Sequence, residues 1–365
     1  MSAVDNLSIG YAPYSSDFSS SGDRRRFVYY ANSKAIDFEI AKPENEYDVV
    51  FVTHGADITV WSKYDKSKAV IVYELIDSYL ATPVLSFYGL FRGVSKYLSG
   101  KYKYCQLNQK KSIESMCRNA DIVICSTEEQ KNQIRHYCDD VRIILDVKSE
   151  YHNYRMTLQP KPKNNELNIA WEGVPHNIKS FAVIRDALSI LSKQYQINLH
   201  LITALKYKKY MNKYLTKHTV NEVKKYIDIN NVYLYQWNEL TVSHISSACD
   251  FAIIPIDSND TMDNGKPEDK LFIIWLMGLP TVDSETPAHL RAMKGAGLSM
   301  ACSSTNDWVS TIKDIVDNKT KRNQSAKKGF DYATRVNSEE RTISLWDDLF
   351  EDIKRFHNLR RRPPT

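Results

Sequence analysis

Cys249-Asp-Phe-Ala-Ile-Ile-Pro-Ile256 is an apolar run that ends at a proline, as expected for a buried strand. Further along, Lys266-Pro-Glu-Asp-Lys270 leads directly into Leu271-Phe-Ile-Ile-Trp-Leu-Met-Gly-Leu-Pro-Thr-Val282, which predicts a charged loop, a short buried helix and a tight turn into another strand. A helix that begins after such a loop offers free backbone N–H groups and the positive end of its dipole. This stretch therefore predicts a position for a phosphate group at the edge of an α/β sheet.

The composition is that of a folded protein with room for two domains. The chain has 365 residues, of which 42% are hydrophobic and 25% are charged, with only 12 Gly and 12 Pro. Tyrosine is frequent, with 23 residues. The net charge of +5 is compatible with polyanionic partners but is too small to predict them.

The cysteines and histidines predict neither a disulfide framework nor a metal site. The six cysteines contain no Cys-x-x-Cys pair, and the nine histidines are scattered singly. We expect reduced core cysteines and no bound metal. The chain begins without a charged-then-apolar signal sequence, and its longest apolar run, Leu271–Leu279, is too short to cross a bilayer. These features predict a cytoplasmic protein, with contact at the inner face of a membrane as a further option.

Short β-branched runs alternate with amphipathic segments through the whole chain. In the first half the candidate strands are Leu7–Tyr11, Tyr47–Thr53, Ala69–Tyr73, Asp121–Cys125 and Val141–Leu145. In the second half they are Leu167–Trp171, Asn198–Ile202, Val232–Tyr235, Phe251–Ile254 and Thr281–Val282. Helices are expected between them, for example from Glu128 to Tyr137 and from about Ile178 to Gln194. Strands separated by helices build parallel sheets.

A polar, proline-interrupted segment, Gln159–Asn165, separates the two halves and reads as a linker. The predicted fold is α/β, with two doubly wound Rossmann-like domains facing across a cleft. The expected boundaries are residues 1–158, a linker at 159–166, residues 167–345, and a C-terminal helix with a basic tail at 346–365. Ligands of such folds lie at the carboxyl ends of the strands, so the cleft is the expected site.

Several short motifs follow one another in a fixed order in the second half. They are Ile169–Gly173, Asn177–Lys179, Tyr235–Glu239 and Lys270–Pro280, while Ala120–Lys131 forms a strand-turn-helix in the first half. This order resembles the GT-B glycosyltransferases, particularly the retaining group that includes glycogen synthases and bacterial cell-envelope sugar transferases (glycosyl transferases group 1). The resemblance implies metal-independent transfer of a hexosyl or pentosyl group from a nucleotide-diphosphate sugar, with retention of configuration.

In that family a basic pair near the first strand of the second domain binds the donor diphosphate, and one of its two positions holds a lysine here. Lys179 stands where the family has its lysine after the glycine, whereas Val174 replaces the family's arginine. Lys270 matches the lysine that opens the helix before the Gly-Leu-Pro turn in some members. Charge developing on the leaving diphosphate would be stabilised there. The alternative for both is a solvated surface lysine.

The family's pair of glutamates is absent here. Gly265 and Ile273 occupy their positions, so the contacts to the ribose and to the sugar hydroxyls must come from other groups. Glu268 and Asp269 are the candidates to replace them. With Gly265, they complete the expected donor site of the second domain.

Further candidates lie in the first domain. Gly22, Arg24 and Arg25 fall where the family has a flexible glycine-rich loop, so the arginines could reach the donor phosphate or an anionic acceptor; a solvated helix start is the alternative. His54 ends a predicted strand and matches a family histidine that contacts the transferred sugar, and a structural histidine is its alternative. Asp77 could orient the acceptor hydroxyl or serve as a helix N-cap. His54 and Asp77 are the catalytic candidates.

Two basic, tyrosine-rich stretches bear on the partner. Leu85–Tyr104 favours contact with the acceptor or a membrane, whereas Lys206–Tyr226 favours an amphipathic surface helix with Tyr207, Tyr210 and Tyr214 on one face. Nucleic-acid binding by charge and stacking is the alternative for both. A lipid-linked or polysaccharide glycan is the favoured acceptor.

Two rival functions remain open. A sugar-nucleotide epimerase of the same architecture would need pairs of carboxylates in the cleft, for which Glu74, Asp77 and Glu172 are the only hints. A degenerate, non-catalytic module would bind a nucleotide or nucleic acid without turnover. The fate of a nucleotide sugar separates the three functions, since it is hydrolysed or transferred, epimerised, or only bound.

Overall fold

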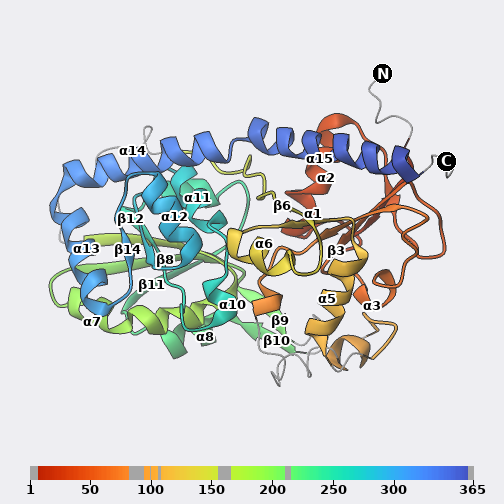
Figure 1. The fold of residues 1–365 in the computed structure, drawn as a ribbon. Helices are drawn as coiled ribbons and strands as arrows, with labels where there is room; N and C mark the ends of the chain where they lie inside the picture. Colours follow the sequence, from red (N-terminus) through yellow and green to blue (C-terminus); the bar gives the residue numbers. More distant parts are fainter. Residues whose placement is uncertain are drawn as a thin grey trace. The chain divides into compact units, whose positions relative to one another are not determined.

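The computed structural model describes residues 7–81, 94–98, 100–105, 108–154, 166–209 and 215–360. The chain forms two compact units (Figure 1). Unit 1 consists of Met1–Val147 and Glu339–Thr365, and unit 2 of Lys148–Ser338, so the chain passes between the units twice. The expected linker at 159–166 lies outside the described residues except for Glu166, which begins a strand.

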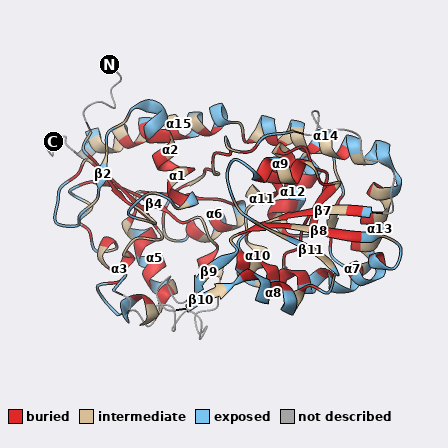
Figure 2. Ribbon diagram, turned by 180° about the vertical axis from the view of Figure 1, so that it is seen from behind, coloured by how far each residue is buried: buried red, intermediate tan, exposed pale blue. Residues whose placement is uncertain are grey.

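Unit 1 is built on a six-stranded parallel sheet with the order β2-β1-β3-β4-β5-β6. The strands are β1 (Ile9–Ala12), β2 (Glu39–Ile40), β3 (Val49–Thr53), β4 (Val70–Glu74), β5 (Ile122–Cys125) and β6 (Asp140–Ile143). Every residue of β1, β3, β4 and β5 is buried, which is why these runs lack polar alternation (Figure 2). The chain leaves β1 toward one edge through β2 and returns to the other side through β3. The carboxyl ends of β1 and β3 therefore form the topological switch point of unit 1.

The helices of unit 1 come from both ends of the chain. They are α1 (Ser21–Arg24), α2 (Phe27–Lys34), α3 (Ile58–Trp61), η1 (Tyr79–Ala81), α5 (Gln109–Asn119), α6 (Glu128–Ile134) and α15 (Glu339–Arg360). The apolar face of α15 completes the core of this unit. Trp346 stacks on Tyr30 with ring centroids 5.7 Å apart, and Phe350 stacks on Phe51 at 5.6 Å. The C-terminal helix expected from residue 346 thus begins at Glu339 and belongs to the first sheet.

Unit 2 repeats the architecture with the strand order β11-β8-β7-β12-β13-β14, again all parallel. The strands are β7 (Glu166–Glu172), β8 (Gln196–Thr203), β11 (Asn231–Gln236), β12 (Phe251–Ile254), β13 (Thr281–Ser284) and β14 (Ala301–Cys302). The sheet order reverses between β7 and β12, so their carboxyl ends form the switch point of unit 2. The predicted doubly wound α/β architecture is confirmed in both units.

The helices of unit 2 cover both faces of its sheet (Figure 1). They are η3 (Pro175–Ile184), α7 (Arg185–Ser192), α8 (Thr219–Tyr226), α9 (Val242–Ser247), α10 (Thr261–Asn264), α11 (Asp269–Leu276), α12 (Pro287–Gly295), α13 (Thr305–Asp317) and α14 (Lys319–Val336). The helix expected over 178–194 is divided, because its first part is the 3₁₀ segment η3 and only its second part is the α-helix α7.

The predicted surface helix over Lys206–Tyr226 is wrong in its first half. There, β9 (Lys206–Lys209) pairs with β10 (Leu215–His218) as an antiparallel hairpin, and helix α8 begins only at Thr219. In β9 the less exposed Tyr207 lies between the exposed Lys206 and Lys208, as the alternating faces of a strand require. The Tyr207 hydroxyl donates to Glu222 at 2.7 Å, which fastens the hairpin to α8. Tyr210 and Tyr214 lie outside the described residues, as do residues 85–93 and 99 of the stretch Leu85–Tyr104.

Within the described part of the chain, no helix is both long and apolar enough to span a bilayer.

Candidate functional site

The switch point of unit 2 gathers the polar residues that the sequence singled out. Strand β7 ends at Glu172 and is followed by Gly173 and η3, and strand β12 is followed by the loop that carries α10 and the start of α11. Because β7 and β12 are neighbours in the sheet, these two connections lie at the same edge. The motifs around Gly173 and Lys270 therefore come together although about a hundred residues separate them.

Lys270, the second residue of α11, reaches across to the end of β7. Its Nζ donates to the Glu172 carbonyl oxygen at 2.9 Å and lies 3.6 Å from the Glu172 carboxylate. The same ammonium lies 5.7 Å from the centroid of the Trp171 ring. A Cβ at Gly173 would come within 2.8 Å of Nζ, so the absence of a side chain there gives the ammonium its place.

Two more lysines flank this position and share one aspartate. Lys179 lies inside η3 and not at a helix start, and its Nζ pairs with Asp263 at 3.2 Å and Asp260 at 3.6 Å. Lys266 pairs with Asp263 at 2.6 Å and donates to Asn177 at 3.3 Å. Although burial opposes the shift, the hydrogen bond and charge of Lys266, followed by those of Lys179, lower the pKa of Asp263. Asp263 is therefore the counter-ion that both lysines share.

The imidazole of His176 lies within range of the charges of all three lysines. Desolvation, and then the charges of Lys266, Lys270 and Lys179, lower its pKa, while the charge of Asp263 opposes the shift. The lysines and their carboxylate partners therefore form a cluster of mixed charge near His176. Lys266 was not among the predicted site residues, although it opens the charged loop that the sequence pointed to.

The remaining predicted residues of unit 2 lie at the head of α11. Gly265 follows the last residue of α10, and Glu268 directly precedes α11. Burial raises the pKa of the Glu268 carboxyl. Asp269 is the first residue of α11, where a carboxylate complements the helix dipole, and it accepts a hydrogen bond from Lys148 at 2.5 Å. Asp269 is thus engaged by Lys148, whereas Oε2 of Glu268 is buried without a hydrogen-bond partner among the described residues.

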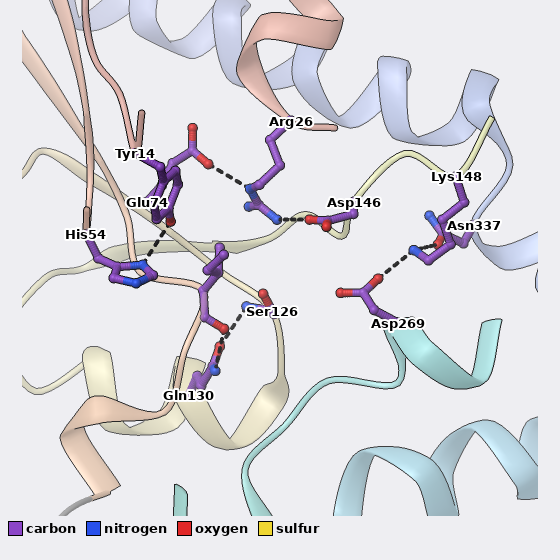
Figure 3. Close-up of polar contacts among 11 residues, drawn as sticks. Tyr14, Arg26, His54, Glu74, Ser126, Gln130, Asp146, Lys148, Asp269 and Asn337 are labelled. Carbon is purple, nitrogen blue, oxygen red and sulfur yellow. Dashed lines mark hydrogen bonds and ion pairs between the residues drawn. The ribbon is translucent and has the colours of Figure 1, made fainter. Parts of the chain in front are cut away.

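In unit 1, the switch point brings together His54 and a tyrosine that the sequence analysis missed. The Tyr14 hydroxyl lies 2.8 Å from His54 Nδ1, and the two rings meet edge to face at 4.8 Å (Figure 3). The Asp23 carboxylate accepts from the Tyr14 N–H at 2.9 Å and fixes the loop after β1. A Cβ at either Gly22 or Gly55 would come within 2.6 Å of the Tyr14 ring. Gly22 and Gly55 therefore leave a slot between them that the Tyr14 ring fills. The sequence did not predict this packing role for Gly22.

Asp77 lies on the other side of His54. Its Oδ2 is 3.5 Å from His54 Nε2, and the Tyr79 hydroxyl lies 3.4 Å from the same nitrogen. Gln130 Nε2 donates to the Ile76 carbonyl oxygen and to the Ser78 hydroxyl, so the backbone on both sides of Asp77 is fixed. The side chain of Asp77 is nevertheless 45% exposed. The two predicted catalytic residues therefore lie together, and Asp77 is the more accessible.

The arginines after Gly22 differ in their surroundings. Arg24 is partly exposed, whereas Arg25 is 9% exposed and its carbonyl oxygen accepts from Val147 N–H at 2.9 Å. Arg26, which the sequence analysis did not select, is fully buried and binds Glu74 at 2.7 Å and Asp146 at 3.0 Å (Figure 3). The run of three arginines does not indicate which of them is buried. Only the fold brings Glu74 and Asp146, which are distant in the sequence, to the guanidinium of Arg26.

Replacement of Gly55 by alanine is expected to destabilise the protein by about 1–3 kcal/mol, because the new Cβ would press on Tyr14. That Cβ would lie 2.9 Å from the Tyr14 Cα, so a side-chain rotation alone does not relieve the contact. Urea unfolding followed by circular dichroism measures the loss. In the double variant Tyr14→Ala/Gly55→Ala the methyl group has space, so Gly55→Ala should add little to the loss from Tyr14→Ala alone. Additive losses would contradict the slot.

The predicted residues thus form two groups, one at each switch point. Lys179, Lys270, Gly265, Glu268 and Asp269 belong to unit 2, and Gly22, Arg24, Arg25, His54 and Asp77 belong to unit 1. Among the described residues, no group of three or more His, Cys, Asp or Glu side chains is placed to hold a metal ion.

Comparison with solved structures identifies the fold. The chain superposes on HepE from Anabaena, in complex with UDP and glucose, with a TM-score of 0.61 at 12% identity; the match covers 96% of this chain and 100% of HepE. It also matches the sucrose-phosphate synthase from Thermosynechococcus elongatus, with a TM-score of 0.57 at 12% identity over 90% of this chain and 76% of that one. These proteins are GT-B glycosyltransferases, so the predicted fold class is confirmed.

A third matching structure is of a protein much longer than this chain. The S. aureus TarM mutant, in complex with fondaparinux, α-GlcNAc-glycerol and UDP, gives a TM-score of 0.54 at 12% identity over 82% of this chain. The match covers 55% of TarM, so the chain spans about half the length of that protein. No family model matches the sequence, and no curated protein matches it.

Proposed function

We propose that this chain is a glycosyltransferase that takes its sugar from a nucleotide-diphosphate sugar and binds the diphosphate at the switch point of unit 2. The observation that carries the proposal is the grouping of three lysines at this edge of the sheet: Lys179 and Lys266 share Asp263, and Lys270 lies against Glu172 beside the glycine at the end of β7. The GT-B fold supports it, because HepE and TarM, which share this fold, are solved with UDP.

The chemistry of the leaving group explains why lysines are needed. When the bond between the anomeric carbon and the phosphate oxygen breaks, the departing diphosphate gains negative charge. Lys270, Lys266 and the N-terminus of the eight-residue helix α11 supply the positive groups that stabilise that charge. We propose that these side chains act in place of a metal ion.

Asp263 and Asp260 have a place in the same proposal. These two carboxylates balance the charges of Lys179 and Lys266. An arriving diphosphate competes with these carboxylates for the ammonium groups. Binding is therefore expected to exchange one set of ion pairs for another, which favours a ligand of high charge density over a single weak anion.

The acceptor side is proposed to lie in unit 1. Asp77 has an accessible carboxylate on a fixed backbone, and its place beside His54 suits it to orient an acceptor hydroxyl. We propose transfer with retention, in which the departing phosphate receives the hydroxyl proton on the face where the new bond forms. A protein base is then not required, and Asp77 serves to orient.

A glycan, lipid-linked or polymeric, is the proposed acceptor. The outward residues of the hairpin β9–β10 include the exposed Lys206 and Lys208, which suit a peripheral contact with an anionic membrane. The protein is proposed to act in the cytoplasm, where nucleotide sugars serve as donors.

A thermal-shift screen with UDP-, GDP-, ADP- and CDP-sugars tests the phosphate site. One donor class is expected to raise the melting temperature of the wild type. For Lys270→Ala the affinity for that donor is expected to fall about tenfold or more, since a charge-assisted contact contributes about 1.5–3 kcal/mol. Lys224→Ala, which removes an exposed lysine on α8, is the matched control and should bind like the wild type. An equal response from Lys270→Ala would place the phosphate elsewhere.

Turnover of the same donor separates the functions. Slow release of free sugar from the donor is expected for a transferase that lacks its acceptor. Recovery of the donor with an inverted sugar centre would identify an epimerase. Binding with neither product over prolonged incubation would identify a module that only binds the nucleotide.

A further inference from the structure

A buried lysine, Lys148, binds the first residue of α11 and also a residue at the end of unit 2. Lys148 is 5% exposed, and its Nζ donates to Asp269 Oδ1 at 2.5 Å and to Asn337 Oδ1 (Figure 3). The same ammonium lies 5.8 Å from the centroid of the Phe272 ring, one turn further along α11. We refer to Lys148, Asp269 and Asn337 as the clasp.

The three members of the clasp have informative positions in the sequence. Lys148 is the first residue of unit 2, and Asn337 is its last residue but one, so they stand at the two passes of the chain between the units. Asn337 is itself fixed, since its N–H donates to the Ala333 carbonyl oxygen at the end of α14. Asp269 directly precedes Lys270. The clasp thus connects the first residue of unit 2 and a residue at its end to Asp269, the neighbour of Lys270 in the sequence.

The chain is also fixed immediately before the first pass. Asp146 pairs with the buried Arg26, and the Val147 N–H donates to the Arg25 carbonyl oxygen at 2.9 Å. Consecutive residues, Val147 and Lys148, are therefore anchored in different units.

Burial makes the clasp a stiff connection. An ammonium removed from water is stable only while its hydrogen bonds and its counter-ion remain in place. Any displacement of the first turn of α11 would lengthen the contact between Asp269 and the buried ammonium of Lys148 and weaken it. The first turn of α11 therefore stays where Lys148 holds it, and the Lys270 backbone stays with it.

We propose that Lys148 is the positioning residue of the phosphate site, acting through Asp269 on Lys270 without contacting the ligand. The proposal rests on the proposed function of Lys270. The Lys270 side chain extends from α11 to the end of β7, where its Nζ donates to the Glu172 carbonyl oxygen at 2.9 Å. A small movement of the helix head lengthens that contact and displaces the ammonium from the point at which it would meet a phosphate.

Lys148→Met tests the proposal, because methionine keeps an apolar stem of similar length and removes the ammonium. With UDP as the probe in titration calorimetry, the dissociation constant is expected to rise about tenfold, within the range of coupling between residues of one network. Lys321→Met is the matched control, since Lys321 pairs with Asp314 in unit 2 away from the clasp, and it should bind like the wild type. Unchanged affinity in a folded Lys148→Met protein overturns the proposal.

A double-mutant cycle separates positioning from a general loss of structure. If Lys148 acts through Lys270, then Lys148→Met should have little further effect on UDP affinity in a Lys270→Ala background. If the two losses multiply, Lys148 acts independently of Lys270 and the proposal fails. Asp269→Asn keeps the shape of the side chain but weakens its hold on the ammonium, so it is expected to reproduce the loss in UDP affinity if Lys148→Met does not fold.

Hydrogen exchange of the protein alone tests the role of Lys148 without relying on nucleotide binding. Lys148→Met is expected to accelerate amide exchange in residues 266–276 and to leave the rest of unit 2 at the wild-type rate. Exchange that is unchanged there, or faster throughout unit 2, contradicts a local positioning role. If the wild type binds no nucleotide at all, the proposed function fails, and the exchange pattern still decides whether Lys148 holds the head of α11.

Discussion

Arg26→Met is expected to destabilise unit 1 by about 3–5 kcal/mol, because it removes the cation from a buried ion triad. Arg26 binds Glu74 at 2.7 Å and Asp146 at 3.0 Å, and neither Arg26 nor Glu74 has any solvent-exposed side-chain surface. Asp146 is partly exposed and can be solvated in the variant. Glu74 is fully buried and cannot be solvated, so the loss of stability is expected to come mainly from its uncompensated carboxylate.

The pH dependence of this loss has a definite sign. Burial raises the pKa of Glu74, and Arg26 opposes that rise, so removing Arg26 is expected to raise the pKa further. A carboxyl whose folded-state pKa exceeds its unfolded value of about 4.3 destabilises the fold as pH increases through and above that value. Denaturant unfolding of Arg26→Met should therefore show a larger deficit at about pH 8 than at about pH 5.

The control for Arg26 neutralises the orphaned carboxylate. Arg26→Met/Glu74→Gln is expected to recover much of the lost stability and to lose the pH dependence. A deficit that is the same at both pH values, or a double variant no more stable than the single one, would show that Glu74 is not the source of the cost.

Trp346→Ala is expected to cost about 3–5 kcal/mol, the range for removing a large buried aromatic side chain. Trp346 is fully buried in α15, stacks on Tyr30 at 5.7 Å and lies near Phe27 and Phe51. Its loss would leave a cavity between the last helix and the first sheet. Urea unfolding followed by far-ultraviolet circular dichroism measures the change, and a chain with two units is expected to show it in the transition of unit 1.

Leu345 provides the comparison on the same helix. Its side chain is adjacent in sequence but 36% exposed, so Leu345→Ala should cost much less than Trp346→Ala. Similar losses for the two variants would indicate that α15 contributes through its helical structure and not through the packing of Trp346.

The sequence predicted the sheets better than the side-chain contacts. Runs such as Val49–Thr53 and Phe251–Ile254 are continuous and β-branched because they are buried on both faces, so their identity as strands was legible from residue type alone. The hairpin β9–β10 was mistaken for a helix because tyrosines spaced three and four apart also match a helical face. In such a short segment the two periods cannot be told apart without the partner strand.

The two functional groups were predictable to different degrees. Lys270 was found because the loop, helix and turn around it form a local pattern. Tyr14, Lys148 and Arg26 were not, because each acts through a residue at least forty positions away, which local periodicity does not report. The placement of α15 in unit 1 was missed for the same reason, since an amphipathic helix shows that it needs a partner but not which sheet provides it.

The position of α15 has a consequence for synthesis of the protein. The first sheet emerges from the ribosome early, but α15, the helix that closes its core, follows the whole of unit 2 in the sequence. Unit 2 is therefore the first of the two to possess all of its own segments, and it can complete its fold while Phe27 and Phe51 still lack their cover. During translation the apolar surface of the N-terminal part therefore stays uncovered until α15 has emerged from the ribosome.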